Sequence, residues 1–234
     1  MAIHTEMLKI NGPNGTLDGY LAAPEAGGAP GVVVIQEIFG VNEHIRSVTD
    51  RLAQAGYAAL APDLFWQTQP GFTSGYSPEE IEHARGLRGK IDDGKAVEDV
   101  GAALQVLETH PKCRGGKMGA TGFCWGGLIT YLVAARLKPA CASSYYGGGI
   151  VNYIGEAQEI TNPVMFHFGD QDASIPMDQV EQIKTTLQGR SEVEIFVYPG
   201  AAHGFHCDMR GSYNEASAHQ AWERTMGFFK KHLA

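Results

Sequence analysis

A cysteine stands at the centre of the segment Gly122-Phe123-Cys124-Trp125-Gly126-Gly127. A nucleophile flanked in this way by glycines is typical of a sharp strand-to-helix turn that holds the reactive side chain above a sheet. The start of the following helix would favour a thiolate, which is the form of cysteine that attacks an acyl carbon. Cys124 is therefore a candidate nucleophile. A buried structural cysteine in a glycine-rich turn is the alternative.

Three other reactive side chains each follow an apolar run that can form a buried strand. Glu37 comes after Ile35, Asp172 after Phe168, and His203 after Tyr198. An imidazole can take a thiol proton and later protonate a leaving group, and a carboxylate can orient that imidazole. The chain order of Cys124, Asp172 and His203 is the order nucleophile, acid, base that α/β-hydrolases use.

Acyl transfer also needs donors for the negative oxygen of the tetrahedral intermediate. The two candidates are the backbone N–H groups of Trp125, directly after the nucleophile, and of Ile38, after the strand that ends at Ile35. No step of this chemistry requires a cofactor or a metal ion.

Other interpretations of these residues stay open. Asp170 and Asp172 could cap the helix that follows them. Glu37 could be an ordinary loop carboxylate. The run His203-x-x-His206-Cys207-Asp208 could supply metal ligands, although no second clustered pair accompanies it.

The elements that would position these residues alternate between strand and helix. The pattern predicts an N-terminal edge hairpin over residues 7–10 and 17–21 with a turn at Asn14-Gly15. Further strands are predicted at 31–35, 57–61, 117–121, 140–146, 163–168 and 193–198, and helices at 42–55, 77 onward, 92–109, 128–136, 176–187 and 214–233. Residues 62–75 and the stretch after Gly147-Gly148-Gly149 are expected to be irregular.

This alternation predicts an α/β fold, with a mostly parallel, doubly wound sheet and helices on both faces. In such a sheet ligands bind outside the carboxyl ends of the strands, where all four candidate side chains are expected to lie. A single domain over residues 1–234 is the simplest organisation for a chain of this length.

Composition restricts the partners. The formal net charge is −8 with no basic block, which argues against nucleic acid or anionic lipid and favours a small-molecule substrate. No apolar run reaches the roughly 20 residues of a membrane-spanning helix. Four cysteines without a C-x-x-C pair, and a polar N-terminal segment, predict a cytoplasmic protein.

Taken together, the motifs resemble those of the dienelactone hydrolases (carboxymethylenebutenolidases), a cysteine-using branch of the α/β-hydrolase superfamily. The likeness runs nearly end to end. The segments that carry it are Val34-Ile35-Gln36-Glu37-Ile38-Phe39-Gly40, Ala61-Pro62-Asp63-Leu64-Phe65, Gly122-Phe123-Cys124-Trp125-Gly126-Gly127, Phe168-Gly169-Asp170-Gln171-Asp172 and Pro199-Gly200-Ala201-Ala202-His203-Gly204-Phe205.

The resemblance implies an esterase or lactonase with Cys124, Asp172 and His203 at the family's triad positions. Glu37 matches a further functional glutamate of that family, toward which the resting, neutral thiol is thought to turn. Because an exposed thiolate is vulnerable to oxidation, that resting state would protect Cys124 between turnovers.

The resemblance is weaker on the substrate side. Well-known members hold a substrate carboxylate with two arginines, and the matching positions here carry Ile81 and Cys207. Neither side chain can replace an arginine fork. Arg85 and Arg210 are candidate substitutes, with solvated surface charges as the alternative interpretation of both.

The sequence therefore predicts a hydrolase that forms a thioester on Cys124 and acts on a small ester or lactone, as a monomer or small homo-oligomer. One rival is a promiscuous small-ester or thioester hydrolase that does not act on dienelactone. The other, from a different class, is a non-catalytic thiol-redox or binding protein.

Overall fold

The computed structural model describes all residues, 1–234, and its chain forms two compact units, Met1–Gly119 and Ala120–Ala234. Strand β5 (Cys113–Phe123) runs from the first unit into the second. The prediction of one domain over the whole chain stays a prediction.

In the first unit the strands lie in the order β1-β2-β4-β3-β5. Strands β1 (Ile3–Gly12) and β2 (Gly15–Pro24) form the predicted edge hairpin, with its turn at Pro13-Asn14, one residue earlier than predicted. Strand β2 also pairs antiparallel with β4 (Ala58–Pro62). Strand β3 (Ala29–Ile35) runs parallel to β4, with Val32 opposite Ala59. Residues 32–35 are completely buried, as expected for a strand covered on both faces.

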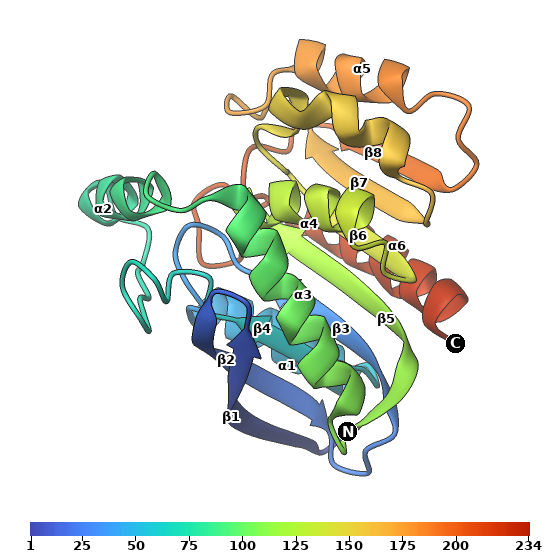
Figure 1. Cartoon of the computed structure of the whole chain (residues 1–234). Coiled ribbons are helices and arrows are strands. Elements are labelled where there is room, and N and C mark those ends of the chain that lie inside the picture. Colours follow the sequence, from blue (N-terminus) through green and yellow to red (C-terminus); the bar gives the residue numbers. More distant parts are fainter. The chain divides into compact units, whose positions relative to one another are not determined.

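Three helices belong to this unit, and each begins with a side-chain cap. Asn42 caps α1 (Glu43–Gln54), and Asp92 caps α3 (Asp93–Thr109). Ser77 and Glu80 form a capping box at α2 (Pro78–Arg88). Helices α1 and α3 pack on opposite faces of the strands (Figure 1), which confirms the doubly wound arrangement.

The second unit continues with the order β5-β6-β7-β8, in which β6 (Cys141–Tyr145), β7 (Val164–Gly169) and β8 (Val193–Tyr198) are parallel. Helix α4 (Trp125–Arg136) is buried on all sides except at Arg136, as its uniformly apolar sequence requires. Helices α5 (Met177–Thr186) and α6 (Glu215–Leu233) complete the unit (Figure 1).

One expectation is wrong. The stretch after the three glycines is a 3-10 helix, η1 (Ile150–Glu159), rather than an irregular segment. Its turns close through short-range bonds such as that from Asn152 N–H to Gly149 O, at 3.0 Å. Such tight turns do not give the hydrophobic period of an α-helix, so the sequence pattern does not indicate them.

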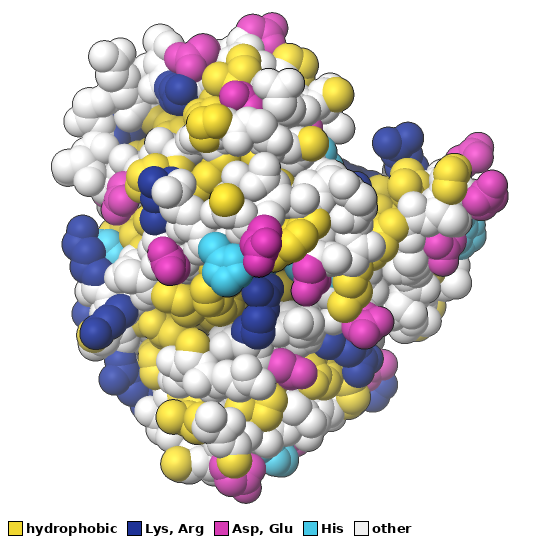
Figure 2. Space-filling model, turned by 180° about the vertical axis from the view of Figure 1, so that it is seen from behind, with side chains coloured by type: hydrophobic (Ala, Val, Ile, Leu, Met, Phe, Trp, Pro, Cys, Tyr) yellow, Lys and Arg dark blue, Asp and Glu magenta, His cyan; other side chains and the backbone are white.

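The surface matches the composition. On the face drawn in Figure 2, acidic and basic side chains are interspersed, and no continuous basic area is present there. No helix of the structure has both the length and the apolar composition that crossing a bilayer requires. All four cysteines are free thiols.

Candidate active site

Cys124 lies at the junction of β5 and α4 in a strained backbone conformation. Its φ is 55°, a left-handed value that few residues other than glycine adopt. The N–H of Cys124 donates to Tyr145 O at 3.0 Å, which ties the turn to the end of β6. A Cβ atom on Gly122 would lie 2.5 Å from Thr130 Oγ1, so the tight turn requires glycine there. This is the geometry predicted for a nucleophile elbow.

The sulfur of Cys124 begins a chain of two hydrogen bonds. Cys124 Sγ lies 3.1 Å from His203 Nε2, and His203 Nδ1 lies 2.8 Å from Asp172 Oδ2. Cys124 and His203 are half-buried, whereas Asp172 is buried. Three residues that are far apart in the sequence therefore meet at the carboxyl ends of β5, β7 and β8, as the strand order predicts.

The other carboxylate oxygen of Asp172 holds its own loop. Asp172 Oδ1 accepts from the N–H groups of Ser174 at 2.8 Å and Ile175 at 3.1 Å. The proposal that Asp172 caps a helix is therefore wrong, because α5 begins only at Met177 and has no side-chain cap. Instead, the turn bonds fix the carboxylate that faces His203.

Asp170 joins the loop of the acid to the loop of the histidine. Its Oδ1 accepts from Gly200 N–H at 2.7 Å, and the backbone N–H of Gln171 donates to Ala201 O at 2.9 Å. Sequence reasoning considered Asp170 only as a helix cap. The available signal was its position two residues before Asp172, on the same loop.

The charges around His203 favour its protonated form. Burial would lower the pKa of His203, but the negative charge of Cys124 and the hydrogen bonds that His203 makes with Asp172 and Cys124 outweigh it and raise the pKa to about 10. The sulfur of Cys124 is turned toward this imidazole, so a proton can pass between Sγ and Nε2. The family resemblance implies a resting thiol turned toward Glu37, whereas in this structure Cys124 Sγ lies within hydrogen-bonding distance of His203.

The two candidate oxyanion donors lie on different units. Trp125 is the first residue of α4, so its N–H belongs to the turn whose donors have no acceptor within the helix. Ile38 lies in the loop after β3 and is half-buried.

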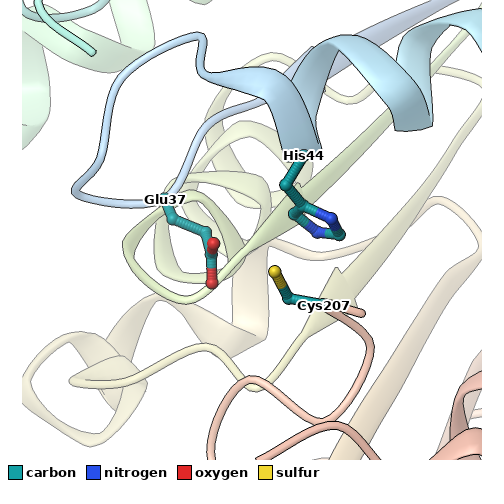
Figure 3. Close-up of side chains that lie close together, drawn as sticks. All are labelled: Glu37, His44 and Cys207. Carbon is teal, nitrogen blue, oxygen red and sulfur yellow. The ribbon is translucent and has the colours of Figure 1, made fainter. Parts of the chain in front are cut away.

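Glu37 lies beside Ile38 in the loop after β3, and its side chain is drawn in Figure 3 together with His44, from the first turn of α1. Its side chain is completely buried. An ordinary loop carboxylate is solvated, so that interpretation of Glu37 is wrong. A carboxylate kept in a buried position is a candidate for function.

The residues considered for substrate binding differ in their surroundings. Arg85 is exposed on α2, and Ile81 is half-buried on the same helix. Cys207, also drawn in Figure 3, is completely buried in the loop that follows His203. Arg210 is half-buried, and its guanidinium carbon would lie 2.8 Å from a Cβ on Gly204, the residue after His203.

The metal-binding interpretation of the His203 loop has little support. Both ring nitrogens of His203 are occupied by Asp172 and Cys124. The ring of His206 is stacked on Phe123, with centroids 5.3 Å apart, and Asp208 is exposed. These side chains do not point to a common centre.

The chain is similar to named proteins over nearly its whole length. The sequence profile of the dienelactone hydrolase family matches residues 17–233. A Synechocystis protein named as a candidate carboxymethylenebutenolidase is 40% identical, over 99% of this chain and 98% of its own. One from Escherichia coli K12 is 35% identical, over 99% of this chain and 88% of its own.

Solved structures agree. The crystal structure of a candidate dienelactone hydrolase from Klebsiella pneumoniae has a TM-score of 0.88 at 34% identity, and covers 99% of this chain and 100% of its own. The Pyrococcus furiosus esterase Pf2001, at 16% identity and a TM-score of 0.75, covers 99% of this chain and 94% of its own and shares the fold alone. With an eight-stranded α/β-hydrolase fold and a family match from residue 17 to residue 233, the chain belongs to the dienelactone hydrolase family.

Proposed function

We propose that the protein hydrolyses esters or lactones through a thioester on Cys124, with His203 as base and Asp172 orienting it. The observation that carries the proposal is the hydrogen-bonded chain from Cys124 Sγ through His203 to Asp172, built on a nucleophile elbow. The sulfur has the position, the exposure and the charged partner that a nucleophile needs.

In the acylation step the thiolate of Cys124 attacks the substrate carbonyl carbon. A C–S bond forms while the carbonyl π electrons move to oxygen, and the Trp125 and Ile38 N–H groups are proposed to stabilise that negative charge. Collapse breaks the C–O bond of the ester. The leaving oxygen takes the proton from Nε2 of His203, which leaves a neutral imidazole and a thioester.

In the deacylation step neutral His203 takes a proton from water as the water oxygen attacks the thioester carbon. Collapse of the second tetrahedral intermediate expels the thiolate and releases the carboxylic acid. The thiolate–imidazolium pair is restored, so the cycle consumes only water. Asp172 keeps Nδ1 protonated throughout and stabilises the imidazolium.

Glu37 is proposed to accept the thiol proton when Cys124 is neutral at rest, as the family resemblance implies. Its complete burial supports a specific role for this carboxylate. A Glu37→Gln variant should slow the first acylation after the resting state more than it slows later turnovers.

Mass spectrometry during turnover of an aryl acetate tests the proposal. Intact protein should gain one acetyl group, mapped to Cys124. Cys124→Ala should lose both the adduct and hydrolysis, whereas Cys141→Ala should keep both, because burial raises the pKa of the Cys141 thiol to about 12. Full hydrolysis by Cys124→Ala would refute the mechanism and favour the thiol-redox or binding rival. Chelators should leave activity unchanged.

A second candidate is a small-ester or thioester hydrolase that does not act on dienelactone. It is favoured by the burial of Cys207 and by Ile81, since neither can bind a substrate carboxylate. Relative turnover of a dienelactone, an uncharged aryl acetate and an acyl thioester separates the two candidates. The free state of all four cysteines supports a reducing compartment such as the cytoplasm for either one.

A further inference from the structure

We infer that Tyr146 is a positioning residue for His203, and that its aromatic ring, not its hydroxyl, keeps the imidazole in the orientation that bonds Cys124. The inference rests on the proposed function, because it assigns a role to the support of the proposed base. Tyr146 lies directly after β6 and is completely buried.

The ring of Tyr146 packs against the imidazole itself. The centroids of the Tyr146 and His203 rings are 5.3 Å apart at an interplanar angle of 63°, an edge-to-face arrangement. The hydrogen bonds of His203 to Asp172 and Cys124 engage the two nitrogens of the imidazole. The tyrosine ring adds an aromatic packing contact to these two bonds, and it also packs against Phe205, two residues after the histidine, at an interplanar angle of 71°.

The backbone of Tyr146 is strained in order to place the ring there. Its φ is 37°, in the left-handed region where an aromatic residue is a genuine outlier. Its N–H donates to His167 O at 2.7 Å, which fixes the turn to β7. Such strain persists only where the surroundings determine the conformation, and it is concentrated at functional sites.

The neighbouring residue connects the same turn to the nucleophile. Tyr145 O accepts the N–H of Cys124, and a Cβ on Gly127 would lie 2.5 Å from that carbonyl oxygen. The end of β6 therefore contacts the elbow through its backbone and the imidazole through the next side chain. The segment Tyr145-Tyr146 therefore positions both the backbone of Cys124 and the imidazole ring of His203.

Three substitutions at one position test the inference. Tyr146→Leu removes the ring, Tyr146→Phe keeps it without the hydroxyl, and Tyr146→Gly removes the ring but accepts the positive φ without strain. Two measurements are made on each: kcat and KM for an aryl acetate, and the pH dependence of Cys124 alkylation by iodoacetamide. Alkylation reports on the sulfur–imidazole pair without requiring hydrolysis.

We expect Tyr146→Leu and Tyr146→Gly to lower kcat about ten- to a hundredfold with KM changed less than about twofold, because a displaced base affects the reaction more than binding. Both should shift the alkylation profile to higher pH, since the imidazolium would support the thiolate less well. Tyr146→Phe should retain the kcat and the alkylation profile of the wild-type protein. Tyr131→Leu, another completely buried tyrosine but without a contact to His203, should leave the profile unchanged.

Two outcomes would overturn the inference. The first is an unchanged kcat and alkylation profile in either ringless variant, and Tyr146→Gly decides the matter if Tyr146→Leu does not fold. The second is a loss in Tyr146→Phe as large as in Tyr146→Leu, which would assign the role to the hydroxyl. Failure of the proposed function gives a different result from failure of this inference. If the proposed function is wrong, the wild-type protein forms no acyl adduct, whereas substitution of Tyr146 still shifts the alkylation profile of Cys124.

Discussion

At the scale of single residues, the role of a side chain in the proposed reaction depends on which of its atoms are already held by hydrogen bonds. Asp172 uses Oδ1 for the N–H groups of Ser174 and Ile175, and Oδ2 for His203. The two functions are separable, since one oxygen maintains the loop while the other orients the base. A substitution that changes only one oxygen can therefore test catalysis without unfolding the loop.

Asp172→Asn is such a substitution. Its amide oxygen can still accept the two turn bonds, while the NH₂ group would face the N–H of His203 and favour the wrong tautomer. We expect kcat to fall on the order of 10³- to 10⁴-fold with little change in Tm. Asp170→Asn is the matched control, because an amide oxygen can still accept from Gly200. A loss below tenfold in Asp172→Asn would contradict the orienting role.

The ionisation of His203 gives a prediction for pH. Cys124→Ala leaves the burial that lowers the pKa of His203, removes the charge and the hydrogen bond of Cys124 that raise it, and keeps only the raising effect of Asp172. NMR titration of the imidazole should therefore give a pKa of about 10 in the unmodified protein and a clearly lower one in the variant. Equal values in the two proteins would show that Cys124 carries no charge beside the imidazole.

The same shift predicts how stability depends on pH. A histidine whose pKa is raised on folding stabilises the native state fully below its unfolded pKa, about 6.5, and loses that contribution as the pH rises toward the folded value. The free energy of unfolding should thus fall between about pH 6.5 and 10 relative to His203→Gln, which lacks the titrating group. Urea unfolding at several pH values measures this difference.

At the scale of elements, the elbow is defined by close backbone contacts. Helix α4 begins against the end of β6, where a Cβ on Gly127 would lie 2.5 Å from Tyr145 O and 2.8 Å from Gly147 Cα. Neither atom belongs to a flexible side chain, so the backbone itself would have to move. The position of Cys124 therefore depends on glycine at 127.

Gly127→Ala should lower the free energy of unfolding by about 1–3 kcal/mol and also reduce kcat, because overpacking displaces the start of α4. Gly155→Ala in η1 is the control, since a Cβ there has no neighbour within 4 Å and its φ is not positive. Chemical denaturation and kinetics of both variants give the comparison. Equal behaviour of the two would show that the elbow tolerates a side chain at 127.

Most of these elements could be predicted because their signals are local. The capping residues Asn42 and Ser77 act within one turn of their helices, and a continuous β-branched run such as 32–35 is typical of a strand buried on both faces. Helix η1 could not be predicted, because its 3-10 turns have no hydrophobic period.

The candidate site was predictable to the same degree. Residue type, strand end and chain order were enough to select Cys124, Asp172 and His203. The burial of Glu37, the bond from Gly200 to Asp170 and the strain at Tyr146 arise from tertiary contacts, which no local pattern records.

At the scale of the whole molecule, the formal net charge of −8 acts on every charged substrate before it binds. An ester that carries a carboxylate is repelled at long range and needs a local cation. In the second unit the candidate for this cation is Arg210, whose guanidinium packs over Gly204, the residue after His203. Arg85 is exposed on α2 in the first unit.

Added salt tests the long-range repulsion of a charged substrate, and substitution of the arginines tests local binding of its carboxylate. Screening of the long-range repulsion should raise kcat/KM for a carboxylate-bearing ester about twofold and leave an uncharged aryl acetate unchanged. Arg210→Gln should raise KM for the charged ester alone, and Arg85→Gln should change neither. A KM increase for both esters in Arg210→Gln would show that this arginine supports the loop of His203 instead of binding a carboxylate.

The hydrogen bond between Cys124 and His203 also has a consequence for synthesis. The two residues are 79 positions apart along the chain. At about 5–20 residues per second, a ribosome takes roughly 4–16 seconds to proceed from the cysteine to the histidine. During that interval the nascent thiol lacks its imidazole partner, so the hydrogen bond to His203 forms only after translation of the last strand and docking of the loop behind it.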